Sequence, residues 1–397
     1  MVLRGGAVKR VGFILSDRSD GWLGGLNYLR NLIAAILANP DRRIHPVLIV
    51  PSEMPAAQLT GFPEVEMARE PLADVYHLGR RLGRIGCRLL GRDFALERVM
   101  ARHRIDLLSH SFGTGARSPW NSIDWIADFQ HVRMPQFFTP QECAARDATF
   151  RAMIDRSRLI LVSSADAKSD LVKFAPDATT KVRVLYFVSG FDNLIAPTSR
   201  IELEQRFGFS GPYFHLPNQF WAHKNHGVVL EALAILKQRG VDVLVLATGK
   251  THDNRNMDYF DGLMARVAVL GIDDHFRPLG IVSLPALYGL MLNSVALINP
   301  SQFEGWSTTV EESKSLGLPM ILSDIPVHVE QAPPLGRYFR AGSAELLADS
   351  MAAALDGYDP TVMASARAQA AADLPRRISA FGQRFEDIAL EAIGRAA

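Results

Sequence analysis

The stretch that decides the fold is residues 299–330, NPSQFEGWSTTVEESKSLGLPMILSDIPVHVE. The apolar run 295–299 that leads into it has the length of a strand. A Pro-Ser loop follows, and the sequence TTVE from Thr308 has the pattern of a capping box, which predicts a helix start. Gly317 predicts the helix end, and residues 320–323 are a second apolar run. This β-loop-α-β order predicts part of a parallel sheet, in which ligands bind at the carboxyl ends of the strands.

The same alternation runs through the rest of the chain. Strand-sized apolar runs recur as RVGFILSD, HPVLIV, RLILVSS, KVRVLYF, VDVLVLATG, VALINPS and PMILSD. Between them lie helix-length amphipathic stretches, among them residues 24–38, 222–239, 255–270 and 343–356. We therefore expect an α/β protein with Rossmann-like, doubly wound parallel sheets.

A length of 397 residues favours two domains. We expect a first domain over residues 1–190, a linker over 191–200 and a second domain over 201–375. Residues 376–397 predict a C-terminal helix that begins after Pro375 and packs back on the first domain, because its apolar residues need a surface to cover them.

Composition narrows the class of protein. The formal net charge of +1 argues against a broadly basic nucleic-acid binder, although the first 200 residues are basic in balance and the remainder acidic. Two cysteines are too few for a disulfide framework, which favours the cytoplasm. No apolar run reaches the roughly 18 residues of a membrane span, and the first residues do not resemble a signal peptide.

The loop before the predicted helix has features of a ligand site. Gly305, Ser307 and Thr308 are small residues at a helix N-terminus, where backbone N–H groups and the helix dipole can hold a phosphate without a metal. Glu304 and Glu312 bracket the helix start, and each carboxylate could accept hydrogen bonds from paired sugar hydroxyls. Alternatively, the acids of this helix are ordinary carboxylates favoured by the dipole.

FEGWSTTVEESKSLG, followed by PMILSDIPVHVEQ, resembles the E-x7-E signature of the retaining nucleotide-sugar glycosyltransferases of the large "group 1" family. Residues 214–226, FHLPNQFWAHKNH, are similar to the opening of that family's second domain, and residues 278–288, PLGIVSLPALY, to its base-binding strand and loop. The resemblance covers most of residues 210–335 and, more weakly, the N-terminal half. It implies the GT-B fold, in which two Rossmann-like domains face a central cleft.

The resemblance also implies roles for individual residues. Lys224 would face the donor diphosphate, Glu312 would bind the ribose hydroxyls and Glu304 would lie against the transferred sugar. Backbone at Gly280, Ile281 and Val282 would edge the base, and the loop at Gly305, Trp306, Ser307 and Thr308 would hold the sugar and phosphate. The nucleotide-sugar is a substrate, and no cofactor or metal is expected.

One position departs from the family pattern. The family often has Arg five residues before the Lys, and this chain has Gln219 there, among the predicted donor-binding residues. Arg277, a helix terminus or a residue of the first domain would have to replace the missing charge, unless donor binding relies on neutral groups.

In the N-terminal half, Gly24 and Gly25 precede a predicted helix and resemble the glycine loop that faces the donor, so both are assigned to the acceptor side of the site and Gly25 also to the donor. Residues 123–138 are similar to the family segment in which a histidine contacts the donor sugar. His131 fits that place, and Asp128 is a further acceptor-side candidate. His131, Glu304 and Lys224 are the predicted catalytic residues.

Two other patterns suggest binding. His223 and His226 have a spacing that invites a metal, but they lack further ligands, and we expect them to cap a helix. Arg80, Arg84, Arg88 and Arg92 recur every four residues beside leucines, which predicts either a helix on anionic lipid or a basic acceptor surface, with a solvated face on a core helix as the alternative.

We therefore expect a retaining, metal-independent hexosyltransferase that acts on a GDP- or UDP-linked sugar and on a saccharide or lipid-linked saccharide, as in the biosynthesis of cell-surface polysaccharide. It would be cytoplasmic, in peripheral contact with the inner face of the membrane and without a nucleic-acid partner. The alternatives are a nucleotide-sugar epimerase of the same fold and a non-catalytic nucleotide- or glycan-binding protein.

Overall fold

The computed structural model describes residues 8–15, 23–74, 76–111, 114–189, 195–253 and 255–394. The chain forms two compact units. The first unit comprises Met1–Phe129, Pro140–Val188 and Pro375–Ala397, and the second comprises Gln130–Thr139 and Ser189–Leu374. The segment Gln130–Thr139 thus belongs to the second unit, whereas the sequence had placed it in the first domain.

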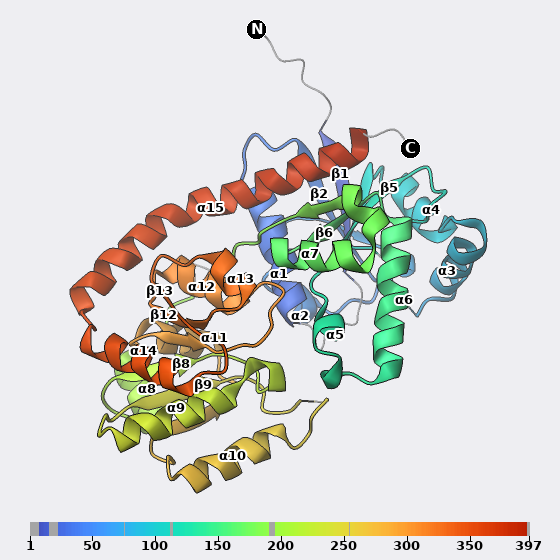
Figure 1. The fold of residues 1–397 in the computed structure, drawn as a ribbon. Coiled ribbons are helices and arrows are strands. Elements are labelled where there is room, and N and C mark those ends of the chain that lie inside the picture. Colours follow the sequence, from blue (N-terminus) through green and yellow to red (C-terminus); the bar gives the residue numbers. More distant parts are fainter. Residues whose placement is uncertain are drawn as a thin grey trace. The chain divides into compact units, whose positions relative to one another are not determined.

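The first unit is built on a seven-stranded sheet with the order β3-β2-β1-β4-β5-β6-β7, in which every pair of neighbours is parallel (Figure 1). Its strands are β1 Lys9–Ile14, β2 Ile44–Val50, β3 Glu66–Arg69, β4 Leu107–Ser109, β5 Asn121–Ile126, β6 Leu159–Val162 and β7 Val182–Val184. Its helices are α1 Leu23–Leu37, α2 Ala56–Leu59, α3 Leu78–Leu90, α4 Phe94–Arg102, α6 Pro140–Arg156 and α7 Ala165–Phe174. Apolar runs such as LILV in β6 are buried along their whole length, as expected for a parallel sheet covered on both faces.

The last helix, α15, is longer than predicted. It runs from Pro360 to Gly394 with Pro375 inside it, so the helix continues through the residue at which the sequence predicted a new start. A proline removes one hydrogen bond of the ladder and disfavours a helix interior. The C-terminal part of α15 belongs to the first unit, where Phe385 is buried and its ring lies 5.5 Å from that of Phe13 in β1.

The second unit is built on a six-stranded parallel sheet with the order β10-β9-β8-β11-β12-β13. Its strands are β8 Tyr213–Leu216, β9 Leu244–Thr248, β10 Phe276–Gly280, β11 Leu297–Asn299, β12 Met320–Ser323 and β13 Gly336–Phe339. Its helices are α5 Gln130–Arg133, α8 Arg200–Phe207, α9 His226–Gln238, α10 Tyr259–Leu270, α11 Leu284–Leu292, α12 Thr308–Leu316, α13 Pro326–Gln331 and α14 Ala344–Asp356. The direction of winding reverses between β8 and β11, which makes this the topological switch point of the sheet.

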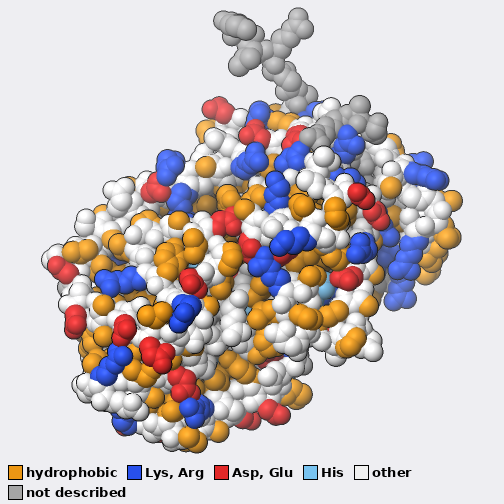
Figure 2. Space-filling model, in the orientation of Figure 1, with side chains coloured by type: hydrophobic (Ala, Val, Ile, Leu, Met, Phe, Trp, Pro, Cys, Tyr) orange, Lys and Arg blue, Asp and Glu red, His pale blue; other side chains and the backbone are white. Residues whose placement is uncertain are grey.

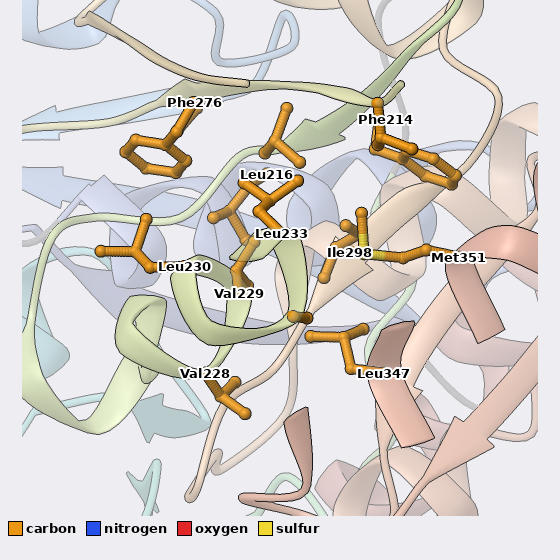
Figure 3. Packing of buried hydrophobic residues seen from close by; sticks show 14 of the residues in the cluster. Phe214, Leu216, Val228, Val229, Leu230, Leu233, Phe276, Ile298, Leu347 and Met351 are labelled. Carbon is orange, nitrogen blue, oxygen red and sulfur yellow. The ribbon is translucent and has the colours of Figure 1, made fainter. Parts of the chain in front are cut away.

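The core of the second unit lies between the sheet and the helices α9 and α14. Figure 3 shows Phe214 of β8 and Ile298 of β11 on the sheet side, with Leu233 of α9 and Leu347 and Met351 of α14 facing them. All five side chains are buried. This packing fixes the strand ends and the loops that leave them, which carry the candidate site.

Candidate functional site

An ion pair joins the loops that follow the two strands at the switch point. Lys224 lies in a short 3-10 turn after β8, and Glu304 lies in the loop after β11. Lys224 Nζ donates to Glu304 Oε1 at 2.6 Å, and both side chains are largely buried. The structure therefore brings together two of the three residues predicted to be catalytic, at the edge of the sheet where ligands bind in α/β folds.

Glu304 is held as a carboxylate. Burial alone would raise the pKa of its carboxyl, but the positive charge and hydrogen bond of Lys224 outweigh burial and hold the pKa at about 2. Ser301 Oγ donates a second hydrogen bond, at 2.8 Å, to Glu304 Oε1. At neutral pH the carboxyl of Glu304 is consequently ionised.

A network of buried amide and hydroxyl groups shapes the loop between β11 and α12. Asn299 is its centre: Asn299 Oδ1 accepts from Asn218 Nδ2 at 3.2 Å, and Asn299 Nδ2 donates to Ser307 Oγ at 3.0 Å. Ser301 Oγ lies 2.7 Å from Asn299 Oδ1 and 2.8 Å from Glu304 Oε1, and these two oxygens share its single proton. Sequence reasoning assigned no role to Asn299 or Asn218. Their position was the signal that could have identified them, because Asn299 ends β11 and Asn218 lies two residues after the neighbouring parallel strand β8.

Helix α12 begins one residue earlier than the capping-box prediction required. Ser307, not Thr308, is the N-cap, and its side chain accepts from Val310 N. Glu311 does not close a capping box, since its carboxylate accepts from Gln331 Nε2 at 3.1 Å and from Lys314 Nζ at 3.2 Å. Gly317 ends the helix in the left-handed conformation, as predicted.

The amides at this helix start are partly engaged. Ser307 N, one of the groups expected to hold the sugar and phosphate, donates to Gln331 Oε1 at 3.3 Å. Thr308 and Thr309 lie in the first turn, where backbone N–H groups have no partner within the helix. Gly305 and Trp306 complete the loop and are half-buried.

Glu312 occupies a different environment from Glu304. Burial raises the pKa of its carboxyl to about 7, although a hydrogen bond with the side chain of Ser189 opposes this increase. No cation is among the groups that shift it. A carboxyl with this pKa is divided between its neutral and ionised forms near physiological pH, so it is not an ordinary solvated acid of the first turns.

The residues predicted to contact the nucleotide base of the donor lie at the end of β10 and directly after it. Gly280 has a φ of +66°, which favours glycine, and its carbonyl accepts from Gly249 N at 2.9 Å. Ile281 is 77% exposed, and Val282 packs partly against a small core cluster. An exposed apolar side chain after a strand end is available for contact with a planar base.

Gln219 and Arg277 are both engaged elsewhere. Gln219 Oε1 accepts from Lys250 N at 2.7 Å, which ties the loop after β8 to the loop after β9. Arg277 Nη1 donates to the carbonyl oxygens of Phe207 and Gly208 at 2.8 and 2.7 Å. The guanidinium of Arg277 therefore binds the C-terminal end of α8.

A second cation, Arg255, lies beside the turn that carries Lys224. Its guanidinium carbon is 5.4 Å from the ring centre of Trp221 and 5.2 Å from that of Phe138, and Arg255 Nη1 donates to Gln130 Oε1 at 3.1 Å. Gln130 and Phe138 belong to the segment Gln130–Thr139 of the same unit. Arg255 escaped the sequence prediction because nothing in its local sequence marks it.

His131 lies in that same segment. It is buried in α5, and its ring lies edge-on to that of Phe138 at 6.3 Å. The segment also contacts the turn that carries Lys224, where the rings of Phe137 and His223 are 6.5 Å apart. The predicted sugar-binding histidine is thus placed in the unit that contains Lys224 and Glu304.

His223 and His226 do not cap α9. Asn225 is the N-cap residue, in a left-handed conformation, and its side chain makes no capping hydrogen bond, whereas His226 N donates to Tyr259 Oη at 3.3 Å. Burial and the charge of Lys224 lower the pKa of His223 to about 3, so the imidazole is neutral at pH 7. Among the residues that the structure describes, no group of three or more His, Cys, Asp or Glu side chains could hold a metal ion.

The acceptor-side candidates of the first unit are less informative. Gly24 and Gly25 lie in the first turn of α1, whereas residues 16–22 of the same glycine loop lie outside the described part of the chain. Asp128 follows β5 and is half-buried. It belongs to the first unit, unlike His131, so the two acceptor-side candidates fall in different units.

Comparisons with known proteins agree with this architecture. Residues 210–371 match the family model described as glycosyl transferases group 1. No curated protein sequence matches the chain.

Several solved structures are similar over nearly the whole chain. A glycosyltransferase from Rickettsia africae has 14% sequence identity and a TM-score of 0.68, with 98% of this chain and 99% of that chain covered. HepE from Anabaena, solved in complex with UDP and glucose, has 16% identity and a TM-score of 0.67, with 96% and 98% covered. WaaG, a glycosyltransferase involved in lipopolysaccharide biosynthesis, has 15% identity and a TM-score of 0.59, with 96% and 99% covered. The chain therefore has the GT-B fold, and its residues 210–371 match the family of group 1 glycosyl transferases.

Proposed function

We propose that this glycosyltransferase is a retaining enzyme that moves a hexose-type sugar from a GDP- or UDP-linked donor to a hydroxyl of a saccharide or lipid-linked saccharide, as in the assembly of a cell-surface polysaccharide. The observation that carries the proposal is the buried Lys224–Glu304 pair at the switch point of the donor-side sheet. The structure of HepE with UDP supports a UDP-linked donor by analogy of fold.

The chemistry requires stabilisation of a leaving diphosphate. The bond between the anomeric carbon and the phosphate oxygen breaks, and the acceptor oxygen forms the new bond to that carbon from the same face. The acceptor proton passes to the departing phosphate oxygen. Lys224 and the first turn of α12 place positive charge where negative charge develops, and their fixed positions make this stabilisation effective.

Glu304 is better suited to binding than to nucleophilic attack. Its Oε1 already accepts from Lys224 and Ser301, which weakens that oxygen as a nucleophile. The second carboxylate oxygen can accept from hydroxyls of the transferred sugar. In this role Glu304 positions both the sugar and the ammonium of Lys224, and His131 contributes a further contact to the sugar.

We assign to Arg255 the charge that Gln219 lacks, although its guanidinium also lies 3.5 Å from the buried carboxylate of Asp253. Its guanidinium lies against Trp221, three residues before Lys224, and both cations contribute to the low pKa of His223. Gln219, by contrast, uses its side-chain oxygen to hold Lys250 N. Two cations on adjacent loops could then share the diphosphate without a metal ion, and we expect turnover to persist in EDTA.

The test is a panel of nucleotide-sugars with a panel of saccharide acceptors. Acceptor-dependent release of UDP or GDP, with retained anomeric configuration in the product, supports the proposal. A changed sugar without release would indicate an epimerase, and binding without either reaction would indicate a non-catalytic protein. Thermal shifts with UDP and GDP measured separately identify the base, because a tightly bound ligand raises the unfolding midpoint.

Variants test the site itself. Lys224→Met and Glu304→Gln should each reduce kcat at least a hundredfold, since removal of one group that stabilises a transition-state charge has about this effect. Lys168→Met, an exposed lysine of the first unit, is the control. Wild-type turnover in either site variant would exclude the assignment.

Arg255→Gln tests the replacement charge separately. It should weaken binding of the nucleoside diphosphate more than that of the nucleoside, because only the former carries the phosphates. Arg206→Gln, at an exposed arginine of α8, is the matched control. Equal losses for both ligands would argue against a role at the diphosphate.

A further inference from the structure

Helix α3 of the first unit carries an apolar ridge that the protein leaves uncovered. Leu78, Leu82, Ile85 and Leu89 are 68%, 59%, 50% and 77% exposed. At 100° per residue the four positions fall within an arc of about 60°, so they form one continuous line along the helix. Contiguous exposed apolar surface of this kind marks an interaction site.

The opposite face of α3 is firmly anchored. Arg80 is buried in an ion pair with Asp93, which is also the N-cap of α4. Gly83 lies so close to Asp93 that a Cβ would overlap its carboxylate, and Cys87 is buried. The exposed leucines are therefore held in place by a packed helix. Arg80 does not belong to the predicted basic stripe, because its charge is neutralised inside the unit.

The remaining arginines form a row beside the ridge. Arg81, Arg84 and Arg88 are exposed and occupy an adjoining arc of about 60°. Residues 78–92 contain no acidic side chain. Arg92 is paired with Glu97 of α4, so it too lies outside the row. Figure 2 shows basic and hydrophobic side chains side by side over α3, at the right-hand edge of the molecule.

An apolar ridge beside a row of arginines fits a partner whose surface is anionic and whose interior is apolar. A second copy of the chain would bring the same arginines close to one another and cost free energy by like-charge repulsion. An anionic lipid bilayer accepts the leucines among its acyl chains and the arginines among its phosphates. No helix in the described part of the chain is long and apolar enough to span such a bilayer.

We propose that α3 docks the first unit onto an anionic lipid bilayer, with the Leu78–Leu89 ridge inserted at the headgroup boundary and Arg81, Arg84 and Arg88 bound to lipid phosphates. A lipid-linked acceptor would then reach the enzyme at the surface where it resides. The docking surface and the donor site lie in different units of the chain.

Vesicle flotation of the full-length protein tests this proposal in the absence of any nucleotide-sugar, so its result is independent of the transfer reaction. Wild-type protein should float with vesicles of phosphatidylcholine and phosphatidylglycerol and not with phosphatidylcholine alone. Arg81→Gln/Arg88→Gln should weaken binding by about fivefold for each arginine, and high salt should have a similar effect. Leu82→Glu/Leu89→Glu should abolish it.

Controls separate docking from folding and self-association. Val269→Glu, at an exposed apolar residue of α10, should float like wild type. Thermal unfolding should give the same midpoint for all variants. If the glutamates disturb α3, the variant Leu82→Ser/Leu89→Ser replaces Leu82→Glu/Leu89→Glu in the flotation assay. Absence of wild-type binding, or unchanged binding of the leucine variants, would overturn the proposal. So would a wild-type dimer in lipid-free light scattering that the leucine substitutions dissociate.

Discussion

Glu312→Gln should stabilise the protein at high pH and leave it almost unchanged at low pH. The folded-state pKa of Glu312, about 7, lies above the ordinary value of 4.5, because burial disfavours the ionised carboxyl. The ionised form therefore opposes folding. This destabilisation is absent well below pH 4.5, grows as the pH rises towards 7, and is complete above the folded-state pKa.

The size of the effect follows from the pKa difference. A shift of about 2.5 units corresponds to about 3 kcal/mol at pH 8, which is an upper bound because the side chain is only partly buried. At pH 5 the same linkage leaves less than about 1 kcal/mol. The glutamine keeps the shape of the side chain and removes the charge, so the difference between the two pH values isolates the ionisation.

Urea unfolding of wild type and variant at pH 5 and pH 8, without nucleotide, measures this difference. Asp274→Asn, at an exposed carboxylate of the same unit, should show no such dependence. The reasoning is refuted if Glu312→Gln changes the free energy of unfolding equally at both pH values, or lowers it at pH 8. The proposed ribose contact predicts that the same variant binds UDP or GDP more weakly.

Three further outcomes follow from packing and hydrogen bonding. Gly382→Val should destabilise the protein by about 1–3 kcal/mol in chemical unfolding, because a Cβ at Gly382 would overlap the carbonyl oxygen of Ala35 in α1; an unchanged unfolding midpoint would contradict this contact. Arg80→Met should cost about 3–5 kcal/mol, since it leaves the carboxylate of Asp93 buried without its ion pair, and a circular-dichroism melt that matches wild type would disprove that pairing. Asn299→Leu should cost about 1–3 kcal/mol and reduce turnover with little effect on the far-UV spectrum, and full activity would show that its network does not shape the site.

The donor helix and several central strands could be predicted from the sequence, although the internal strands β4, β5 and β8 were not among the apolar runs singled out. Each of the seven apolar runs singled out contains a strand, since strands buried on both faces must be apolar throughout. Edge strands such as β13, with the sequence GRYF, were missed because they are half-solvated and carry no continuous apolar run. The Lys224–Glu304 contact was not predicted: the family resemblance implied only that both residues face the donor, and 80 residues separate them in the sequence.

Other features depended on tertiary context that no local pattern records. The period of four residues from Arg80 to Arg92 correctly indicated a helix with basic side chains, but Arg80 and Arg92 form ion pairs with α4 and its N-cap. The break predicted at Pro375 was wrong: α15 continues through this residue, although a proline removes one hydrogen bond of the helix ladder. The position of Arg255 depends on its contacts with the rings of Phe138 and Trp221. These residues lie in two distant segments of the sequence, so the arrangement is visible only in three dimensions.

The membership of Gln130–Thr139 in the second unit sets an order of events during synthesis. This segment leaves the ribosome well before its partners Trp221 and Arg255. At about 5–20 residues per second, the ring of Phe138 waits roughly 6 to 23 seconds for the arginine that will lie over it. The first unit in turn lacks the end of α15 until the second unit has been made. Neither unit is therefore formed from one continuous stretch of the nascent chain. Each can complete its packing only after residues from a later part of the chain have been made.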